Sequence, residues 1–115
     1  MNNFQSIRKF EYRRSRMRAG FNVDFIAEGK TFHGLCKDVS DAGIRAEFDG
    51  PIAVGSSGLL ILRHPLQVLK LEARVSHVDK DQVGLIFIFK TPEECGMTVA
   101  YIAEIAGRKT VSRHR

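Results

Sequence analysis

Between residues 21 and 89 the chain alternates short apolar–polar segments with clusters of turn residues at nearly even intervals. The stretch VLKLEARVSHV at 68–78 shows this well, because Leu71, Ala73 and Val75 alternate with charged or polar residues. A period of two indicates a strand with one buried face. With the Gly, Pro, Asp and Ser residues between the segments, the pattern predicts six strands over 21–28, 31–39, 44–48, 59–63, 68–78 and 82–89.

Short strands joined by turns are typical of an antiparallel sheet, and closure into a barrel removes the sheet edges that a small domain must otherwise protect. The chain has 115 residues, of which 43% are hydrophobic, and this suffices for the core of one domain. Its apolar runs are far shorter than the roughly 20 residues of a membrane span. We therefore expect a six-stranded antiparallel β-barrel without membrane insertion.

After residue 90 the pattern becomes that of a helix. Thr91 is the predicted N-cap, and the proline and two glutamates that follow it favour a helix N-terminus. Gly107 is the predicted end of the helix. The expected fold class is therefore all-β with a C-terminal helix. The apolar stripe that would pack this helix against the barrel consists of Met97, Tyr101, Ile102 and Ile105.

The net charge of +5 is unevenly distributed along the chain. Residues 1–18 contain six bases and one acid, residues 108–115 contain four bases and no acid, and residues 19–107 contain eight bases and twelve acids. We expect a flexible basic N-terminal arm (1–18), a barrel with its helix (19–107) and a basic tail (108–115). Basic ends on an acidic body suit an anionic partner.

Nothing in the sequence supports catalysis or a metal site. The two cysteines and four histidines are scattered without metal-ligand spacing. GSSG at 55–58 lacks the lysine of a P-loop, and no nucleophile–base pair can be inferred among His33, Asp38 and Ser40. MNNFQSIRKF has no apolar signal-peptide core. We expect a cytoplasmic protein that is not an enzyme and has no cofactor.

Two short motifs stand out. Arg14 and Arg18 form an RxxxR pattern in the arm, with Arg13 directly before it. A DxSxxG pattern, DVSDAG at 38–43, lies at the end of the second predicted strand and in the turn that follows. Each motif is weak alone. Their order, and the strand–turn–strand segment between them, make a much stronger joint signal.

With these motifs the sequence resembles the PilZ domain family, which binds the bacterial second messenger cyclic di-GMP. The segment AGFNVDF at 19–25 is similar to the family's first strand, and EARV at 72–75 and VGLIF at 83–87 are similar to its late strands. The resemblance covers residues 8–106. It implies a six-stranded antiparallel barrel with a C-terminal helix, in agreement with the periodicity.

The resemblance assigns the ligand to the two motifs. The planar fork of arginine suits both phosphate oxygens and the guanine O6 and N7 atoms, so Arg14 and Arg18 are expected to bind cyclic di-GMP. Asp38 would accept hydrogen bonds from guanine or hold an arginine in place. Ser40 would offer its hydroxyl to the ligand, and Gly43 would let the backbone approach the ligand closely. Arg45 would make an additional contact with a base.

Arg13 bears on the ligand stoichiometry. In the family, the residue before RxxxR influences how many ligands bind, and an arginine there resembles the version that takes an intercalated pair of cyclic di-GMP molecules. A third guanidinium would help to offset the charge of the second dinucleotide.

The expected function is therefore a receptor that changes its arm conformation on binding cyclic di-GMP and signals to an unidentified partner protein in motility, exopolysaccharide or biofilm control. One alternative is a PilZ-fold adaptor that acts on proteins without nucleotide. The other is a small barrel that binds single-stranded nucleic acid, which we do not expect because the barrel region is acidic and its aromatic residues alternate inward.

Overall fold

The computed structural model describes residues 17–114, and the side chains of residues 18–105. The strands of the described part are β1 (Met17–Arg18), β2 (Asn22–Ala27), β3 (Lys30–Val39), β4 (Gly43–Phe48), β5 (Ser57–His64), β6 (Gln67–Asp79) and β7 (Gln82–Ile88). The helix α2 (Pro92–His114) follows them. The six predicted strands correspond to β2–β7, whereas the two-residue strand β1 was not predicted.

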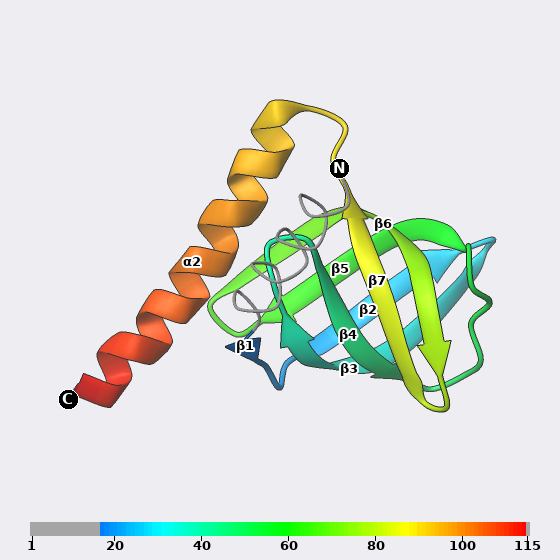
Figure 1. Ribbon diagram of the computed structural model, residues 1–115, viewed down its shortest axis with the longest axis horizontal. Coiled ribbons are helices and arrows are strands. Elements are labelled where there is room, and N and C mark those ends of the chain that lie inside the picture. Colours follow the sequence, from blue (N-terminus) through cyan, green and yellow to red (C-terminus); the bar gives the residue numbers. More distant parts are fainter. Residues whose placement is uncertain (1–16, 115) are drawn as a thin grey trace, which may run out of the picture.

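The sheet is a closed antiparallel barrel. Its strand order is β3-β2-β5-β6-β7-β4, and β4 pairs back with β3 to close the ring (Figure 1). Strand β1 adds to β3 beyond the segment that pairs with β2, with Met17 opposite Val39 and Arg18 opposite Asp38. The end of β3 therefore has β1 on one side and β4 on the other.

The barrel interior is filled by the inward-facing side chains of the strands, which alternate with outward-facing ones. The burial pattern of β7 alternates along its whole length, and that of β2 does so from its second residue. Fully buried members of this core include Val23, Phe25, Leu60, Leu62 and Leu85. Burying such side chains stabilises the fold by roughly 1.5–3 kcal/mol each. The rigid barrel fixes the positions of residues on its outer surface.

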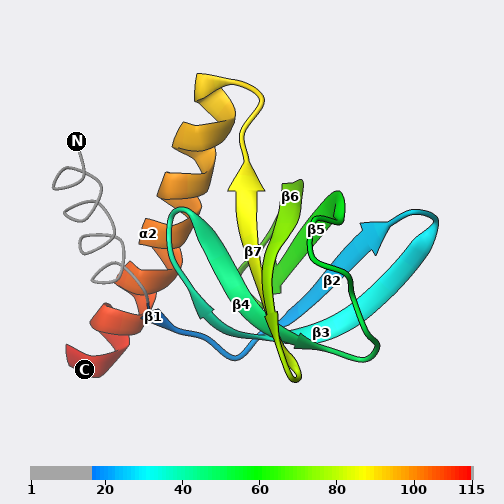
Figure 2. The ribbon, with the colours of Figure 1, turned by 45° about the vertical axis from the view of Figure 1, so that its right-hand side comes forward.

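Helix α2 lies beside one end of the barrel, near the turn between β5 and β6 (Figures 1 and 2). Its start is as predicted, because the Glu94 N–H donates to Thr91 Oγ1 at 3.1 Å. Tyr101 Oη donates to Gln67 O at 3.2 Å and ties the helix to β6. Burial raises the pKa of Tyr101 to about 12, so this phenol keeps its proton at physiological pH.

The predicted apolar stripe of α2 was wrong at one position. Met97 is 62% exposed, and Thr98 is fully buried in its place beside Tyr101, Ile102 and Ile105. The hydroxyl of Thr98 donates to Glu94 O at 2.9 Å, so its polar group is satisfied within the helix. A threonine therefore takes a core-facing position that was assigned to an apolar residue.

The predicted end of the helix at Gly107 was also wrong, because α2 continues to His114. A glycine inside a helix costs only about 1 kcal/mol relative to alanine, so helical neighbours can carry the chain through it. Residues 108–114 are thus part of the helix rather than a separate tail. No helix in the described part of the chain is long and apolar enough to cross a membrane.

Candidate functional site

The DxSxxG motif occupies the end of β3 and the turn into β4. The Ser40 N–H donates to Gly43 O at 2.9 Å. Ser40 Oγ accepts from the Ala42 N–H at 3.2 Å and donates to Gly43 O at 3.4 Å, and Ser40 is fully buried. The hydroxyl therefore holds the turn together. The predicted contact between Ser40 and a ligand stays a prediction.

Gly43 is required by the packing of β4 against β7. A Cβ atom at Gly43 would lie 2.2 Å from Leu85 O, a distance that no side chain permits. The predicted close approach of the Gly43 backbone to a ligand stays a prediction. The structure adds a separate requirement for glycine here, which is the close approach of two neighbouring strands.

Asp38 lies between two arginines from different strands. Strand pairing sets Arg18 of β1 directly opposite Asp38, and sets Arg45 of β4 opposite it on the other side. Directly opposed residues of an antiparallel pair point to the same face. The second arginine of RxxxR and the first residue of DxSxxG, 20 positions apart in sequence, are therefore cross-strand neighbours on the outer surface of the barrel.

The Asp38 carboxylate holds the Arg45 guanidinium through a contact of 2.6 Å between Arg45 Nη2 and Asp38 Oδ2. The Asp38 side chain is only 11% exposed, whereas the Arg45 side chain is 52% exposed. The carboxylate thus lies under the surface and orients a guanidinium whose side chain is half-exposed. Such an oriented fork is suited to phosphate or guanine edges.

The row of outward-facing residues continues past Arg45 onto the next two strands. Arg45 lies opposite Gly84 of β7, and Gly84 lies opposite His77 of β6, next to a register shift between Val75 and His77. Gly84 is not required by the fold, because a Cβ atom there would meet nothing closer than 3.5 Å. The outer row therefore has no side chain at Gly84, between Arg45 and His77.

The sequence patterns did not identify Gly84 or His77 as candidate site residues. The available signal was a glycine inside an otherwise regular strand, which indicates a bulge or a close approach of another group. The other predicted site residues, Arg13 and Arg14, lie outside the described residues. The structure therefore brings together Arg18, Asp38 and Arg45, and places Ser40 and Gly43 in the adjoining turn.

A pocket of about 330 Å³ borders Arg18 on the side of the helix. The His64 ring packs edge-on against Phe21 at 5.2 Å, and His64 Nδ1 accepts from the Leu66 N–H at 3.1 Å. Burial lowers the pKa of His64 and so favours the neutral ring, whose proton lies on Nε2 because Nδ1 is the acceptor. The pocket is lined by Arg18, Ala19, Gly20, Phe21, His64, Pro65 and Ile105.

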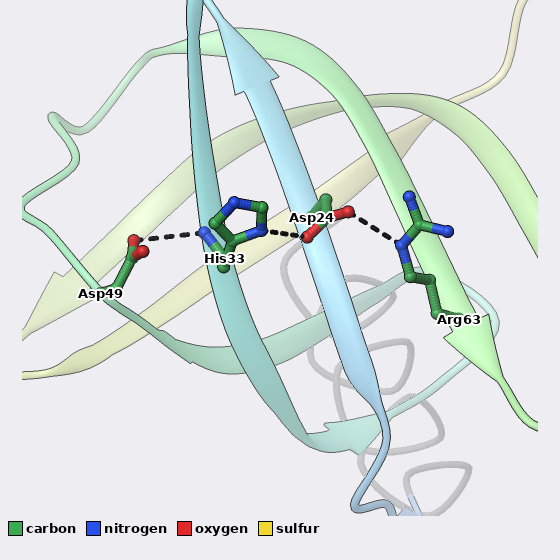
Figure 3. Close-up of polar contacts among 4 residues, drawn as sticks. All are labelled: Asp24, His33, Asp49 and Arg63. Carbon is green, nitrogen blue, oxygen red and sulfur yellow. Dashed lines mark hydrogen bonds and ion pairs between the residues drawn. The ribbon is translucent and has the colours of Figure 1, made fainter.

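A second polar cluster lies on the outer face of β2, β3 and β5 (Figure 3). Asp24 accepts from Arg63 Nε at 2.8 Å and contacts His33 Nδ1 at 2.7 Å. The His33 N–H donates to Asp49 Oδ1 at 3.1 Å. Burial raises the pKa of Asp24, but the hydrogen bonds and charges of Arg63 and His33 outweigh it and leave that pKa below its usual value.

His33 therefore pairs with Asp24 and takes no part in the Asp38 row. Among the residues that the structure describes, no group of three or more His, Cys, Asp or Glu side chains is arranged to hold a metal ion.

Comparison with known proteins identifies one family. The family model of the PilZ domain matches residues 7–104 of this chain. The fold is similar to the PilZ domain of CeSA from a cellulose-synthesizing bacterium, with a TM-score of 0.67 at 13% identity over 79% of this chain and 97% of that one. It is also similar to the PilZ domain of Escherichia coli YcgR with c-di-GMP, with a TM-score of 0.64 at 14% identity over 84% and 94%.

A further structure of similar fold is the Bacillus subtilis inhibitor of motility MotI/DgrA, with a TM-score of 0.65 at 20% identity over 88% of this chain and 52% of that one. No curated protein matches the sequence. The likeness of these structures concerns the fold, and the family match covers most of the sequence. The chain belongs to the PilZ domain family.

Proposed function

We propose that the chain is a non-enzymatic receptor for cyclic di-GMP. The observation that carries the proposal is the cross-strand alignment of Arg18, Asp38 and Arg45, which joins the RxxxR and DxSxxG motifs on one surface. The family match supports it, as does the similarity to the YcgR PilZ domain, whose structure contains c-di-GMP.

In the proposed complex, Arg18 and Arg45 bind the phosphates or guanine edges of the ligand, with Arg45 oriented by Asp38. One guanine lies over Gly84, between Arg45 and His77. Ser40 and Gly43 fix the turn at the end of the row. Arg14 completes the RxxxR contact from the arm, and Arg13 favours an intercalated pair of ligands.

The signal follows from the position of the arm. Only Met17 and Arg18 pair with β3 in the described part of this segment, so the arm is joined to the barrel next to the ligand row. A ligand that bridges Arg14 and Arg18 to the Asp38–Gly43 turn favours one arm position over others and presents a new surface to a partner protein. By family resemblance, that partner acts in motility, exopolysaccharide synthesis or biofilm control.

Isothermal titration calorimetry of the wild type and of site variants measures ligand binding and tests the proposal. Arg14→Ala and Arg18→Ala should each abolish or strongly weaken binding of cyclic di-GMP, and cyclic di-AMP should bind poorly to the wild type. The wild type should bind two ligands per chain, and Arg13→Ala should reduce this to one.

A glycine pair provides the matched control. Gly84→Glu places an acid in the ligand row, at a position where a Cβ atom meets nothing closer than 3.5 Å, and should abolish binding. Gly96→Glu makes the same change on α2, where a Cβ atom meets nothing within 4 Å, and should leave binding unchanged. Wild-type protein that gives no heat and no thermal shift with cyclic di-GMP would overturn the proposal and favour a nucleotide-independent adaptor.

A further inference from the structure

Three polar side chains on the outer face of the barrel are joined to one another outside the ligand row. Arg63 Nε donates to Asp24 Oδ2 at 2.8 Å, and His33 Nδ1 lies 2.7 Å from Asp24 Oδ1 (Figure 3). Strand pairing sets Asp24 of β2 directly opposite His33 of β3. One carboxylate therefore lies between an arginine and a histidine and holds both.

Asp24 fixes the tautomer of His33. Burial raises the pKa of Asp24, but the hydrogen bonds and charges of Arg63 and His33 leave it below its usual value, so the carboxylate is ionised at neutral pH. An ionised carboxylate only accepts hydrogen bonds, and His33 Nδ1 is therefore the donor. In the neutral ring the lone pair is then on Nε2, which lies on the side of the ring away from Asp24 (Figure 3).

The His33 ring stands on the surface of the barrel. Its side chain is 67% exposed, whereas that of Asp24 is 13% exposed. The backbone N–H of His33 donates to Asp49 Oδ1 at 3.1 Å, which holds the strand at this position. The ring thus has one nitrogen anchored on a carboxylate that lies mostly under the surface, and its nucleophilic nitrogen is on the other side. This arrangement suits reaction with a group that another molecule brings.

The other two histidines in the described part of the chain are arranged differently. His64 Nδ1 accepts from the Leu66 N–H, so the proton of its neutral ring lies on Nε2. His77 is exposed, but among the described residues no carboxylate pairs with its ring. Within that part of the chain, only His33 combines exposure with a carboxylate that directs the lone pair to Nε2.

We propose that His33 is a phosphoryl-acceptor site for a donor that carries its phosphoryl group on nitrogen, as phosphoramidate does. The His33 Nε2 lone pair attacks phosphorus and forms a new N–P bond. The N–P bond of the donor breaks, and its electron pair leaves on the donor's protonated nitrogen as ammonia. The ring becomes a positively charged phosphoimidazolium, whose Nδ1–H keeps its hydrogen bond to the negative Asp24.

The exposure of His33 favours a phosphoryl group over an acyl group. An acyl group on imidazole is lost rapidly to water unless the site excludes water, whereas a phosphoryl group persists longer. The modification adds negative charge to the outer face of β3 and so changes what this surface binds. It lies apart from the row of Arg18, Asp38 and Arg45, and the proposal does not depend on cyclic di-GMP binding.

Intact-mass spectrometry of the full chain incubated with phosphoramidate measures the transfer. The wild type should gain one phosphoryl group, and peptide mapping should place it on His33 at a rate at least about tenfold above that at His77, which has no carboxylate partner in the described part of the chain. His33→Gln should abolish the modification. His77→Gln is the matched control, because it also removes an exposed histidine from a strand, and it should leave the rate unchanged.

Asp24→Asn tests whether Asp24 positions the ring. An amide also donates hydrogen bonds, so Nδ1 of His33 is no longer held as the donor. The wild type should carry the phosphoryl group on Nε2 alone, whereas Asp24→Asn should react more slowly and give both ring isomers, which NMR of labelled histidine distinguishes. A wild type that stays unmodified under conditions that phosphorylate free imidazole would overturn the proposal. Equal rates at His33 and His77, or an Asp24→Asn variant with the rate and isomer of the wild type, would overturn it as well.

Discussion

Replacing Arg45 with alanine should impair both ligand binding and stability, by amounts that two assays separate. Arg45 pairs with Asp38 at 2.6 Å, and the Asp38 side chain is only 11% exposed, so losing this partner should cost about 1–3 kcal/mol of folding free energy. A hydrogen bond to a charged ligand group contributes about 1.5–3 kcal/mol. We therefore expect Arg45→Ala to weaken cyclic di-GMP binding by about 10- to 100-fold while the free energy of unfolding falls by about 1–3 kcal/mol.

Titration calorimetry and urea denaturation, performed on the same preparations, measure the two quantities. A double-mutant cycle with Asp38→Asn then separates the two roles considered for Asp38. If Asp38 acts by orienting Arg45, its substitution should have little further effect on binding in the Arg45→Ala background. If Asp38 contacts the ligand itself, the two losses should add. Wild-type affinity in Arg45→Ala would refute the reasoning, because the row would then lack its central contact.

Three further predictions concern stability. Gly43→Ala should lower the free energy of unfolding by about 1–3 kcal/mol because its Cβ conflicts with Leu85 O, whereas Gly84→Ala should change it by less than about 0.5 kcal/mol in the same urea titration. Burial lowers the pKa of His64, so the stability it contributes is complete above its ordinary pKa of 6.5 and is lost as the pH falls through the lowered value. Wild-type stability should therefore decrease on acidification from about pH 7.5 to about pH 5 more steeply than that of His64→Gln; equal slopes would contradict this. The lowered pKa of Asp24 gives stability that is present above its ordinary value of 3.8 and is lost as the pH falls through the lowered value. Asp24→Asn should therefore be less stable at neutral pH and lose less on acidification, which an acid-unfolding series followed by circular dichroism would measure.

The regular part of the fold was predictable because it depends on local patterns. Strands β2–β7 have a period of two and are bounded by turn residues, and Thr91 has the chemistry of an N-cap. Strand β1 was missed because two residues have no periodicity. Met97 was placed in the core because its chemistry is apolar, whereas Thr98 occupies that position with its hydroxyl bonded to Glu94 O.

The motif residues could be identified from the sequence, but their arrangement could not. The two motifs identified Arg18 and Asp38, yet only the pairing of β1 with β3 makes them neighbours. Gly84 and His77 join the row through a register shift in β6, which no local pattern specifies. The contribution of Arg45 was expected from resemblance, and its ion pair with Asp38 supplies a physical reason for it.

The central claim is that cyclic di-GMP binds along one cross-strand row, and an NMR titration of backbone amides tests it most directly. Adding the ligand to isotope-labelled protein should shift the amide signals of Arg18, Asp38, Arg45 and Gly84. The signals of Asp24 and His33, which belong to the polar cluster on other outer strand positions, should stay in place and serve as the internal control (Figure 3). Shifts confined to that cluster, or no shifts at saturating ligand, would contradict the account.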